Sequence, residues 1–341
     1  MKKNTRILII LSIVLVFCIG AYIGVSVYNA DIAKKETAET DESLLYPPDW
    51  DAPSHILYET GGSTLSFTRE DTLWYYDGDR NFPLKQSSLT SLSSTLSSLA
   101  TIRTFDAPAD LSDYGLVAPS YSVTSADSGG NRLTLLIGVM SGENYYVMKS
   151  GGDKVYTIDP SIVESLQPDI LKMIALDTIP TLNETTIDTI TLTDDTQSVM
   201  LDKYQARDGT YTWFVVDGTT YTSADDYVLS NGSNSAAANV TNVLSALGGL
   251  SFSSCAAFNP ADDTLVSYGL AVPGVTVTVD YTTTDSNKKE TSGTVVIEIG
   301  QMLADESGCY ARLAGSDQIN VLASDKTSSI VDALDAMGIA L

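Results

Sequence analysis

The sequence is poor in the residues that most often carry catalysis or bind metals. Histidine occurs once, at His55, and cysteine three times in 341 residues. A histidine-rich metal site is therefore excluded, and a Ser-His-Asp hydrolase site would have to use His55. Because His55 lies at the start of a predicted strand beside a linker, we interpret it as an ordinary surface or edge residue.

Several catalytic motifs are missing as well. The chain has no phosphate-binding loop of the Gly-x-x-x-x-Gly-Lys type, no dinucleotide fingerprint after a predicted strand, and no Gly-x-Ser-x-Gly nucleophile elbow. Carboxylates are abundant, but no pair is distinguished as the acid and base of a glycosidase. We therefore expect no enzymatic activity, no cofactor and no metal. An extracytoplasmic carbohydrate- or peptide-active hydrolase with paired carboxylates is the alternative.

Basic residues are too few to balance the acids. The chain has 19 Lys and Arg against 43 Asp and Glu, which gives a net charge of −24. Such a surface repels nucleic acid and anionic lipid headgroups, so we do not expect nucleic-acid binding. Solubility alone accounts for this acidity.

A calcium loop is a more specific explanation of the acidic residues. The segment from Asp77 to Asn81 begins like one, with Asp77 and Asp79 at the first and third positions. Phe82 then replaces the glycine that the loop needs, and Ser88 replaces the closing glutamate. We therefore do not expect a calcium site.

The first 30 residues contain no acid and include a long uncharged run. Lys2, Lys3 and Arg6 precede this run, which extends from Ile7 to Tyr28 and is long enough to cross a membrane. A signal-peptide core is shorter, and the cleavage sites here are poor, so we predict an uncleaved anchor over residues 1–30, with a removed signal as the alternative. The three bases predict a cytoplasmic N-terminus and an extracytoplasmic body.

The cysteines leave the redox state of the body open. Cys18 falls within the uncharged run, so only Cys255 and Cys309 remain beyond it. Two cysteines cannot form a disulfide framework of the small secreted type. They could bridge each other or be buried thiols, and the sequence does not decide between the two.

A repeated motif predicts a duplicated domain. The stretch Tyr114-Gly115-Leu116-Val117-Ala118-Pro119 returns 154 positions later as Tyr268-Gly269-Leu270-Ala271-Val272-Pro273. This period is too long for a solenoid repeat, which has about 20–50 residues. We therefore predict two tandem domains, residues 54–180 and 181–341, after a proline-stiffened linker over residues 31–53.

Each predicted domain is of the α+β class, with a mainly antiparallel sheet and one or two helices. Strand-like runs bounded by turn residues form the sheet, as at Val275 to Val279, where apolar residues alternate with threonine. In the first domain Leu89, Leu92, Leu96 and Leu99 fall at helical spacing and predict one apolar helix face. The second domain differs in an inserted loop at 231–235 and a longer hairpin tip at 282–289.

The repeated turn has a structural interpretation. Glycine accepts a positive φ without steric cost, and proline fixes φ and opens an extended segment. We predict a positive φ at Gly115 and Gly269, in a turn that leads into a strand. A ligand-binding loop is the alternative.

The order of these motifs resembles the bacterial family called domain of unknown function 4340, in two copies. The residues that carry the resemblance form a tryptophan strand, the Tyr-Gly-Leu-x-x-Pro turn and a strand that ends in Ile-Gly. They are Trp74, Tyr114, Gly115, Leu116, Pro119 and Gly138 in the first copy, and Trp213, Tyr268, Gly269, Leu270, Pro273 and Gly300 in the second; Tyr146 and Tyr310 follow on the next strand.

The resemblance implies no established activity. Some members of the family are associated with ABC-transporter systems, including those named for gliding motility, which implies an accessory role at the cell envelope. We therefore expect a membrane-anchored scaffold or binding component, with an envelope protein such as an ABC transporter as partner. Exposed tyrosines at Tyr75, Tyr76, Tyr145 or Tyr146 would instead favour a surface adhesin or polymer-binding module, although such rings more often fill a core.

Overall fold

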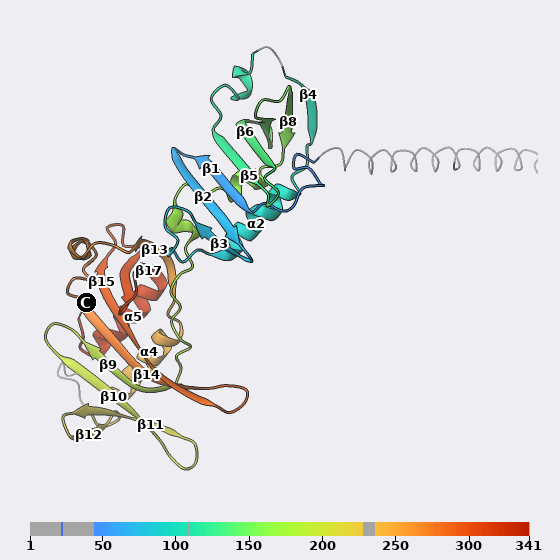
Figure 1. Ribbon diagram of the computed structural model, residues 1–341. Coiled ribbons are helices and arrows are strands. Elements are labelled where there is room, and N and C mark those ends of the chain that lie inside the picture. The colour runs from blue at the N-terminus through green and yellow to red at the C-terminus, as the bar shows by residue number, and fades with distance from the viewer. Residues whose placement is uncertain (1–21, 23–43, 108–109, 228–235, 341) are drawn as a thin grey trace, which may run out of the picture. The chain divides into compact units, whose positions relative to one another are not determined.

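The computed structural model describes residues 22, 44–107, 110–227 and 236–340, which divide into two compact units (Figure 1). Unit 1 comprises Met1–Asn81 and Lys85–Pro168, and unit 2 comprises Phe82–Leu84 and Asp169–Leu341. Each unit is an antiparallel sheet packed on helices, so the predicted α+β class is confirmed. The division after Pro168 falls before the predicted boundary at residue 180.

Unit 1 contains an eight-stranded sheet in the order β3-β2-β1-β5-β6-β7-β8-β4. Every neighbouring pair in it is antiparallel. The strands are β1 (His55–Thr60), β2 (Ser63–Glu70), β3 (Leu73–Tyr76), β4 (Arg103–Asp106), β5 (Tyr121–Ala126), β6 (Arg132–Ser141), β7 (Asn144–Lys149) and β8 (Lys154–Ile158).

Helix α2 (Gln86–Ser97) lies across one face of this sheet, next to the short helix α3 (Ser161–Ser165) (Figure 1). The predicted leucine face of α2 is confirmed, because Leu89, Leu92 and Leu96 are all buried. The β4–β5 connection, which contains the 3₁₀ helix η1 (Ser112–Tyr114), supplies Leu116 to a second, smaller apolar cluster with Met148 and Val155.

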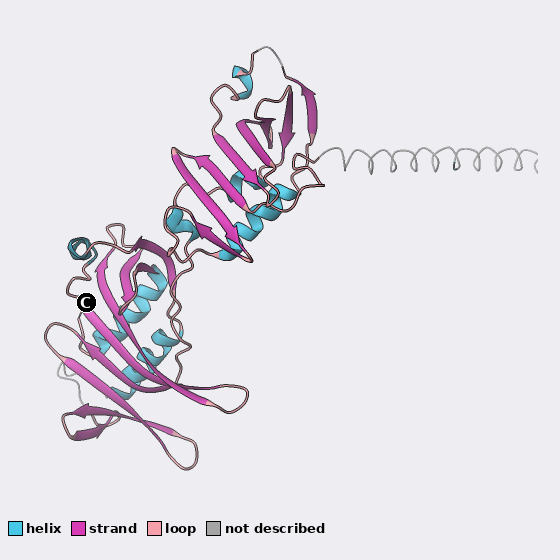
Figure 2. Cartoon of the chain, viewed as in Figure 1, coloured by secondary structure: helices cyan, strands magenta, loops and turns pink. Residues whose placement is uncertain are grey.

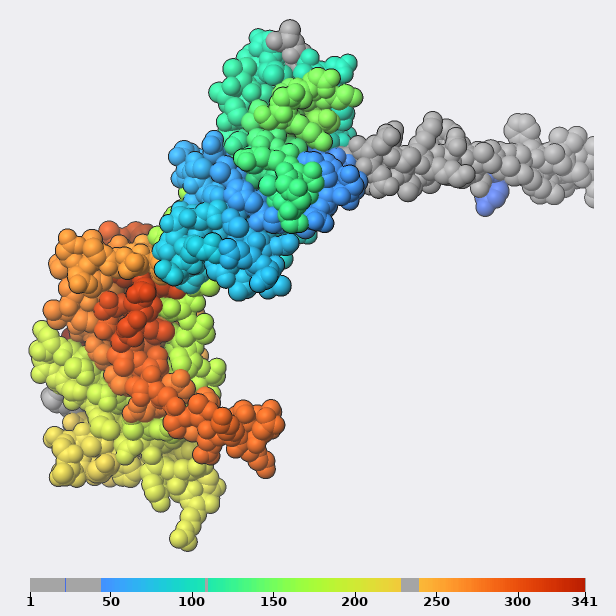
Figure 3. All heavy atoms as spheres, in the orientation of Figure 1, coloured from blue at the N-terminus to red at the C-terminus, as the bar shows by residue number. Residues whose placement is uncertain are grey.

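Unit 2 contains a nine-stranded sheet in the order β12-β11-β10-β9-β14-β15-β16-β17-β13. Its strands are β9 (Ile187–Thr193), β10 (Ser198–Gln205), β11 (Tyr211–Asp217), β12 (Thr220–Ser223), β13 (Phe252–Phe258), β14 (Val275–Thr284), β15 (Glu290–Met302), β16 (Gly308–Leu313) and β17 (Gln318–Ala323). The long β14–β15 hairpin projects from the body of the unit, as the sequence predicts (Figure 3).

Two helices of unit 2, α4 (Ala236–Gly248) and α5 (Ser324–Ala336), cover the same face of the sheet (Figure 2). The inward residues of β14, such as Val275, Val277 and Val279, are completely buried, whereas the threonines between them are not. The predicted alternation is therefore confirmed, and the sheet has one apolar and one polar face. The 3₁₀ helices η2 (Ile170–Met173) and η3 (Asp262–Tyr268) complete the unit.

The two sheets share one strand order. The sequence β3-β2-β1-β5-β6-β7-β8-β4 of unit 1 corresponds to β11-β10-β9-β14-β15-β16-β17-β13 of unit 2, and β12 is added at one edge. A 3₁₀ helix precedes the Tyr-Gly-Leu turn in both units. A duplication requires this common order. Superposition of the two Cα traces, with Tyr114 on Tyr268 and Gly138 on Gly300, stays a prediction.

The N-terminal part differs from the predicted linker. From residue 44 onward the chain packs on unit 1: Leu45 and Tyr46 are buried, and the Leu45 N–H donates to the Leu99 carbonyl at 2.9 Å. Tyr46 also contacts Trp50 edge-on, with ring centroids 5.6 Å apart.

Two predicted features lie outside the described residues. They are the membrane anchor at 7–28, of which only Tyr22 is described, and the inserted loop at 231–235. Among the residues that the structure does describe, no helix has both the length and the apolar character needed to span a bilayer.

Candidate functional site

The Tyr-Gly-Leu turn of unit 1 begins where η1 ends. Gly115 adopts the left-handed conformation with φ of 66°, which confirms the prediction, and its N–H donates to the Ser112 carbonyl at 3.0 Å. The Leu116 N–H then donates to the Leu111 carbonyl at 3.2 Å, which closes the turn and directs the Leu116 side chain into the core. The turn therefore requires glycine for its backbone conformation.

Gly138 lies directly against this turn. A Cβ atom on Gly138 would overlap the carbonyl oxygen of Tyr114, so only glycine fits there. The Tyr114 ring also packs edge-on against Tyr146 of β7, with ring centroids 4.8 Å apart. The Tyr-Gly-Leu, Ile-Gly and tyrosine motifs are thus parts of one contact between the turn and strands β6 and β7.

Unit 2 repeats the arrangement. Gly269 has φ of 68°, and a Cβ on Gly300 would overlap the Tyr268 carbonyl oxygen. The Tyr268 and Tyr310 rings lie edge-on with centroids 4.9 Å apart. Leu270 is buried, as Leu116 is in unit 1.

The remaining motif residues flank these contacts. Pro119 and Pro273 are partly exposed and stand two residues before β5 and β14. Trp74 of β3 is buried, and the Gln86 side chain holds its backbone from both sides, at 2.8 Å to the N–H and 2.9 Å to the carbonyl. Trp213 of β11 is also buried. We interpret all twelve motif residues as determinants of the fold.

Apolar side chains surround both turns on the outside, and the sequence did not single them out. In unit 1, Val117, Val139 and Met140 are 71%, 43% and 51% exposed. In unit 2, Val266, Val272 and Met302 are 67%, 82% and 43% exposed. We call these two sets the turn patches.

Both turn patches adjoin a shared irregularity in the sheets. Both β6 and β15 carry a β-bulge directly after the inward Ile137 or Ile299. A bulge inserts one extra residue and shifts the side chains that follow it to the other face. Simple alternation would place Val139 on the inward face with Ile137, and the bulge interrupts this alternation, so Val139 is exposed.

His55 does meet a serine and an aspartate in the structure. Its Nε2 lies 3.1 Å from Ser66 Oγ and 3.6 Å from Asp77 Oδ2, and Ser66 Oγ donates to that same carboxylate oxygen at 2.5 Å. In a catalytic triad the carboxylate holds Nδ1 and the serine gives its proton to Nε2. Here both partners approach Nε2, and the serine proton is directed to the aspartate. His55, Ser66 and Asp77 therefore form a hydrogen-bonded polar cluster that links β1, β2 and the turn after β3.

The residues of the rejected calcium loop make protein contacts instead. Asp79 Oδ1 accepts the Asn81 N–H at 2.9 Å, and Arg80 pairs with Glu70 at 2.7 Å while lying over the Tyr75 ring. Within the described ranges, no three His, Cys, Asp or Glu side chains come together in a way that could hold a metal ion.

Both cysteines of unit 2 are free, buried thiols, which answers the question that the sequence left open. Burial raises the pKa of the Cys255 thiol to about 11, and it also raises the pKa of Cys309. Thiols of this kind are inert, because the thiolate is the reactive form.

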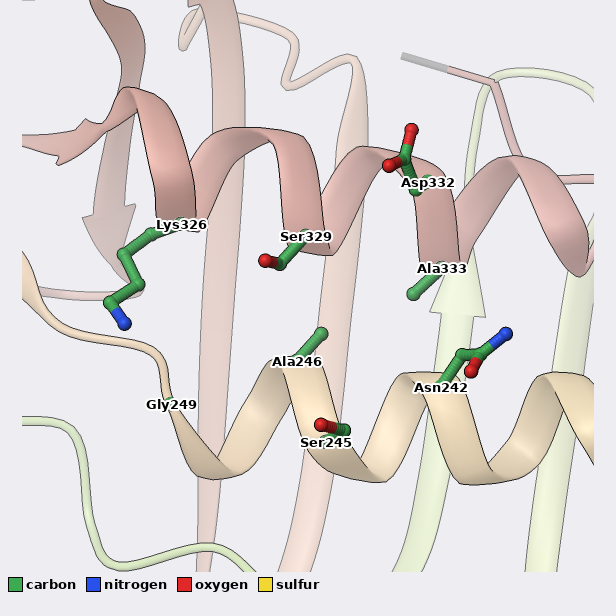
Figure 4. Close-up of a pocket in the computed structure, with 8 residues that line it drawn as sticks. All are labelled: Asn242, Ser245, Ala246, Gly249, Lys326, Ser329, Asp332 and Ala333. Atoms are coloured by element: carbon green, nitrogen blue, oxygen red, sulfur yellow. The ribbon is translucent and has the colours of Figure 1, made fainter.

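A groove of about 530 Å³ lies between α4 and α5, which run in opposite directions (Figure 4). Small side chains, among them Ser245, Ala246 and Ser329, face each other across it. Lys326 extends from α5 toward Gly249 at the C-terminal end of α4, where the helix dipole favours a cation. The helix packing therefore accounts for Lys326 without a ligand.

The comparisons with known proteins give one match. Residues 74–230 match the model of a family described as "Domain of unknown function (DUF4340)". The match begins in β3 and ends after β12, so it covers most of unit 1 and the first strands of unit 2. It is a single segment, and two tandem copies of the family stay a prediction.

No curated protein and no solved structure matched the chain. The family match includes Trp74, Tyr114, Gly115, Gly138 and Trp213, which carry much of the resemblance seen in the sequence. The predicted resemblance is thereby confirmed, and the chain contains a domain of the DUF4340 family.

Proposed function

We propose that this chain is a non-enzymatic scaffold or binding component at the cell envelope. Its N-terminal uncharged run anchors it in the membrane, and its two units lie outside. The partner is an envelope protein, of which an ABC transporter is the kind that the family resemblance implies. The observation that carries this proposal is the pair of turn patches.

The turn patches have the properties of contact surfaces. Each exposes large aliphatic or methionine side chains on a chain whose surface is otherwise strongly acidic. Soluble proteins rarely expose contiguous apolar patches. Where such a patch is surrounded by polar residues, it often marks a site of protein association. Methionine adapts to irregular partner surfaces, which suits Met140 and Met302 to this role.

The backbone around each patch is rigid, which favours binding. The turn is closed by two hydrogen bonds and packed against a glycine, so its exposed side chains are presented without further ordering of the chain. A preorganised surface loses less conformational entropy when it binds. The same frame occurs in both units, so one chain offers two similar surfaces.

The test is loss of the partner after mutation of both turn patches. The chain would be extracted from membranes in mild detergent, with photocrosslinking residues at positions 117 and 272 to identify the protein in direct contact. We expect crosslinks to a transporter subunit, and loss of co-purification when Val117→Ser and Val272→Ser are combined. Tyr204→Ser with Tyr221→Ser is the matched control, because these side chains are exposed away from the turns. Equal recovery of the partner with both double variants would refute the proposal.

A further inference from the structure

One edge of the unit 1 sheet is closed by the chain itself. A strand at a sheet edge presents backbone N–H and C=O groups that no neighbouring strand bonds, and proteins usually block such edges. On the edge strand β3, the side-chain amide of Gln86 bonds both the N–H and the carbonyl of Trp74, at 2.8 and 2.9 Å. Gln86 thus takes the place of a further strand.

Both edges of the unit 2 sheet are obstructed as well. On β12 the carbonyl of Ser223 accepts the N–H groups of Asp226 and Tyr227, at 3.0 and 2.9 Å, where the chain turns back on the strand. Strand β13 is interrupted by two register shifts and is contacted by η2. The fourth edge is formed by β4, at the other side of the unit 1 sheet (Figure 1).

The free backbone groups of β4 belong to Thr104 and Asp106. The Ala107 N–H donates to the Asp153 carbonyl at 2.8 Å, and this pair continues the register of β4 with β8. Because every second residue of an antiparallel strand bonds to a given neighbour, Phe105 also bonds to β8, and the N–H and C=O groups of Thr104 and Asp106 point away from it. Among the described residues these backbone groups have no hydrogen-bond partner.

The neighbouring strands give the same assignment. The Ser150 N–H donates to the Thr134 carbonyl of β6 at 2.8 Å, so the even-numbered residues of β7 bond to β6 and the odd-numbered ones to β8. The register of β7 with β8 then directs Val155 and Thr157 toward β4. The Ile102 N–H, which also donates to the Thr157 carbonyl, lies one residue before this regular pairing.

The outward residues of β4 complement a second copy of themselves. In a two-fold antiparallel pair, outward residues face each other, so the possible pairs are Thr104 with Thr104, Asp106 with Asp106, or Thr104 with Asp106. Two opposed aspartates repel, and the Thr104–Thr104 register sets Asp106 against Ile102, whose N–H is already bonded to Thr157. The Thr104–Asp106 register bonds all the outward backbone groups and lets each threonine hydroxyl donate to a carboxylate.

This register places Phe105 on the two-fold axis, opposite Phe105 of the second copy. Residues of the non-hydrogen-bonded pairs approach most closely in an antiparallel ladder, and aromatic pairs there are favourable. The Phe105 ring is already held on its own unit by Tyr114 and Tyr146, with ring centroids 5.7 and 6.2 Å away. It therefore needs little further ordering to meet its counterpart.

The local charge permits two copies to meet at this edge. The chain as a whole carries a net charge of −24, so two copies repel each other over most of their surfaces. Strands β4 and β8 differ, because Arg103 and Lys154 stand against Asp106 as the one acid of the two strands. A second copy that approaches β4 does not face an acidic surface.

We propose that the chain forms a two-fold dimer through β4, in which the two unit 1 sheets join into one continuous antiparallel sheet. Thr104 of each copy pairs with Asp106 of the other, and the Phe105 rings meet at the axis. Each chain has one open edge among its described strands, so the assembly closes at two copies. The dimer does not depend on the turn patches or on the envelope partner proposed for them.

A proline on β4 tests the backbone pairing. Thr104→Pro removes an N–H that makes no bond within its own unit, and edge strands tolerate proline at such positions. Tyr221→Pro is the matched control, because the Tyr221 N–H also points outward, from β12. For the full-length protein in detergent, sedimentation should show dimers for the wild type and for Tyr221→Pro. Thr104→Pro should raise the dissociation constant about tenfold or more, because each copy loses an intermolecular donor.

Disulfide trapping tests the register and does not require a proline variant to fold. In a Cys18→Ser background, Phe105→Cys would bring two cysteines to the axis with their Cα atoms about 4.5 Å apart, within the range that a disulfide spans. Mild oxidation should then give a covalent dimer. Tyr221→Cys, which is exposed on another edge strand, is the control and should stay monomeric on a non-reducing gel.

Three results would overturn the proposal. The first is a wild-type protein that is monomeric at every concentration tested. The second is a Thr104→Pro variant that folds and dimerises like the wild type, as it would if the N-terminal uncharged run alone held the copies together. The third is a Phe105→Cys variant that crosslinks no faster than Tyr221→Cys.

Discussion

The carbonyl oxygen of Tyr114 occupies the space that a Cβ atom on Gly138 would fill, and Tyr268 stands in the same relation to Gly300. The two residues of each pair are far apart in the sequence. Their contact joins the turn after a 3₁₀ helix to the bulge of a central strand. A close approach of this kind fixes where the turn sits on the sheet, and it leaves no room for any other residue type.

The first prediction concerns these close contacts. Gly138→Ala and Gly300→Ala should each destabilise the protein by roughly 1–3 kcal/mol, because the added methyl group meets backbone atoms that cannot move independently. Gly249→Ala is the matched control, since its Cβ would have no neighbour closer than 3.6 Å and its φ is not positive. Denaturant unfolding would measure the differences. A cost for Gly249→Ala equal to that for Gly300→Ala would contradict the steric explanation.

The second prediction concerns the turn glycines. Gly115→Val and Gly269→Val should each cost roughly 1–3 kcal/mol, because a β-branched residue is strongly disfavoured at φ near 66° or 68°. At Gly115 the new side chain would also meet Val139, whose Cγ1 lies 2.7 Å from the Cβ position. Each unit has its own core, so the effect should stay mostly within the mutated unit.

Amide hydrogen exchange would show whether the destabilisation stays within the mutated unit. Gly115→Val should raise amide exchange in β5 and β6 of unit 1, and Gly269→Val should raise it in β14 and β15 of unit 2. Unchanged thermal midpoints in both variants would show that these glycines serve something other than the fold, and a binding loop would then be the better interpretation.

Sequence patterns predicted the elements whose periodicity is strong. The leucines of α2 repeat at helical spacing and are buried, and the valines of β14 alternate and are buried. In such segments the local sequence pattern agrees with the tertiary packing, so the pattern is sufficient to predict the helix or strand and its buried face. The positive φ of Gly115 and Gly269 was predictable for a similar reason, because the turn chemistry is local.

The edge strands were not predictable in this way. β4 (Arg103–Asp106) has no buried residue, and both β4 and β13 pair on one side only, with β8 and β17. A strand of this kind forms because a partner strand offers hydrogen bonds, and its own residues carry no alternation.

The candidate sites depend on contacts between distant residues, which no local pattern records. Val139 would face inward by simple alternation from Ile137, and it is exposed because the bulge interrupts that alternation. The backbone groups of Thr104 and Asp106 point outward because β8 bonds the residues beside them. The sequence could not show this open edge, because it does not show which strand pairs with β4.

The third prediction concerns membrane topology. The uncharged run from Ile7 to Tyr28 follows three basic residues, so the body should lie outside the membrane. Protease added to intact spheroplasts should therefore digest it. A cytoplasmic marker protein controls for lysis and should remain intact. Full protection of the body, with digestion only after lysis, would show the opposite orientation.

The fourth prediction concerns the thiols. With a pKa of about 11, Cys255 is roughly 0.1% thiolate at pH 8, and Cys309 is also shifted upward by burial. In a Cys18→Ser background, a thiol reagent at pH 8 should label neither cysteine in the native protein within minutes, and both after denaturation. Quantitative mass spectrometry would count the modifications. A denatured protein that requires a reductant before labelling would instead indicate a Cys255–Cys309 disulfide.

The last prediction concerns acid stability. Asp194 accepts hydrogen bonds from Thr196 and Gln197 within its own turn and from the Ala340 N–H at the far end of the chain, and these bonds lower its pKa below the ordinary value of 3.8. A carboxylate whose pKa is lowered by folding stabilises the native state above its unfolded pKa, and that contribution disappears as the pH falls from about 4 toward the folded value.

Asp194→Asn removes the titrating group but keeps its size. We expect the variant to be less stable than the wild type at pH 7, and the difference to shrink as the pH falls below 4, because protonation then weakens the wild-type bonds as well. Urea midpoints measured from pH 7 to pH 2 would show this convergence. Parallel curves for the two proteins would mean that the Asp194 charge contributes nothing, and that the C-terminal residues are held by the packing of Met337 and Ile339 in the core of unit 2.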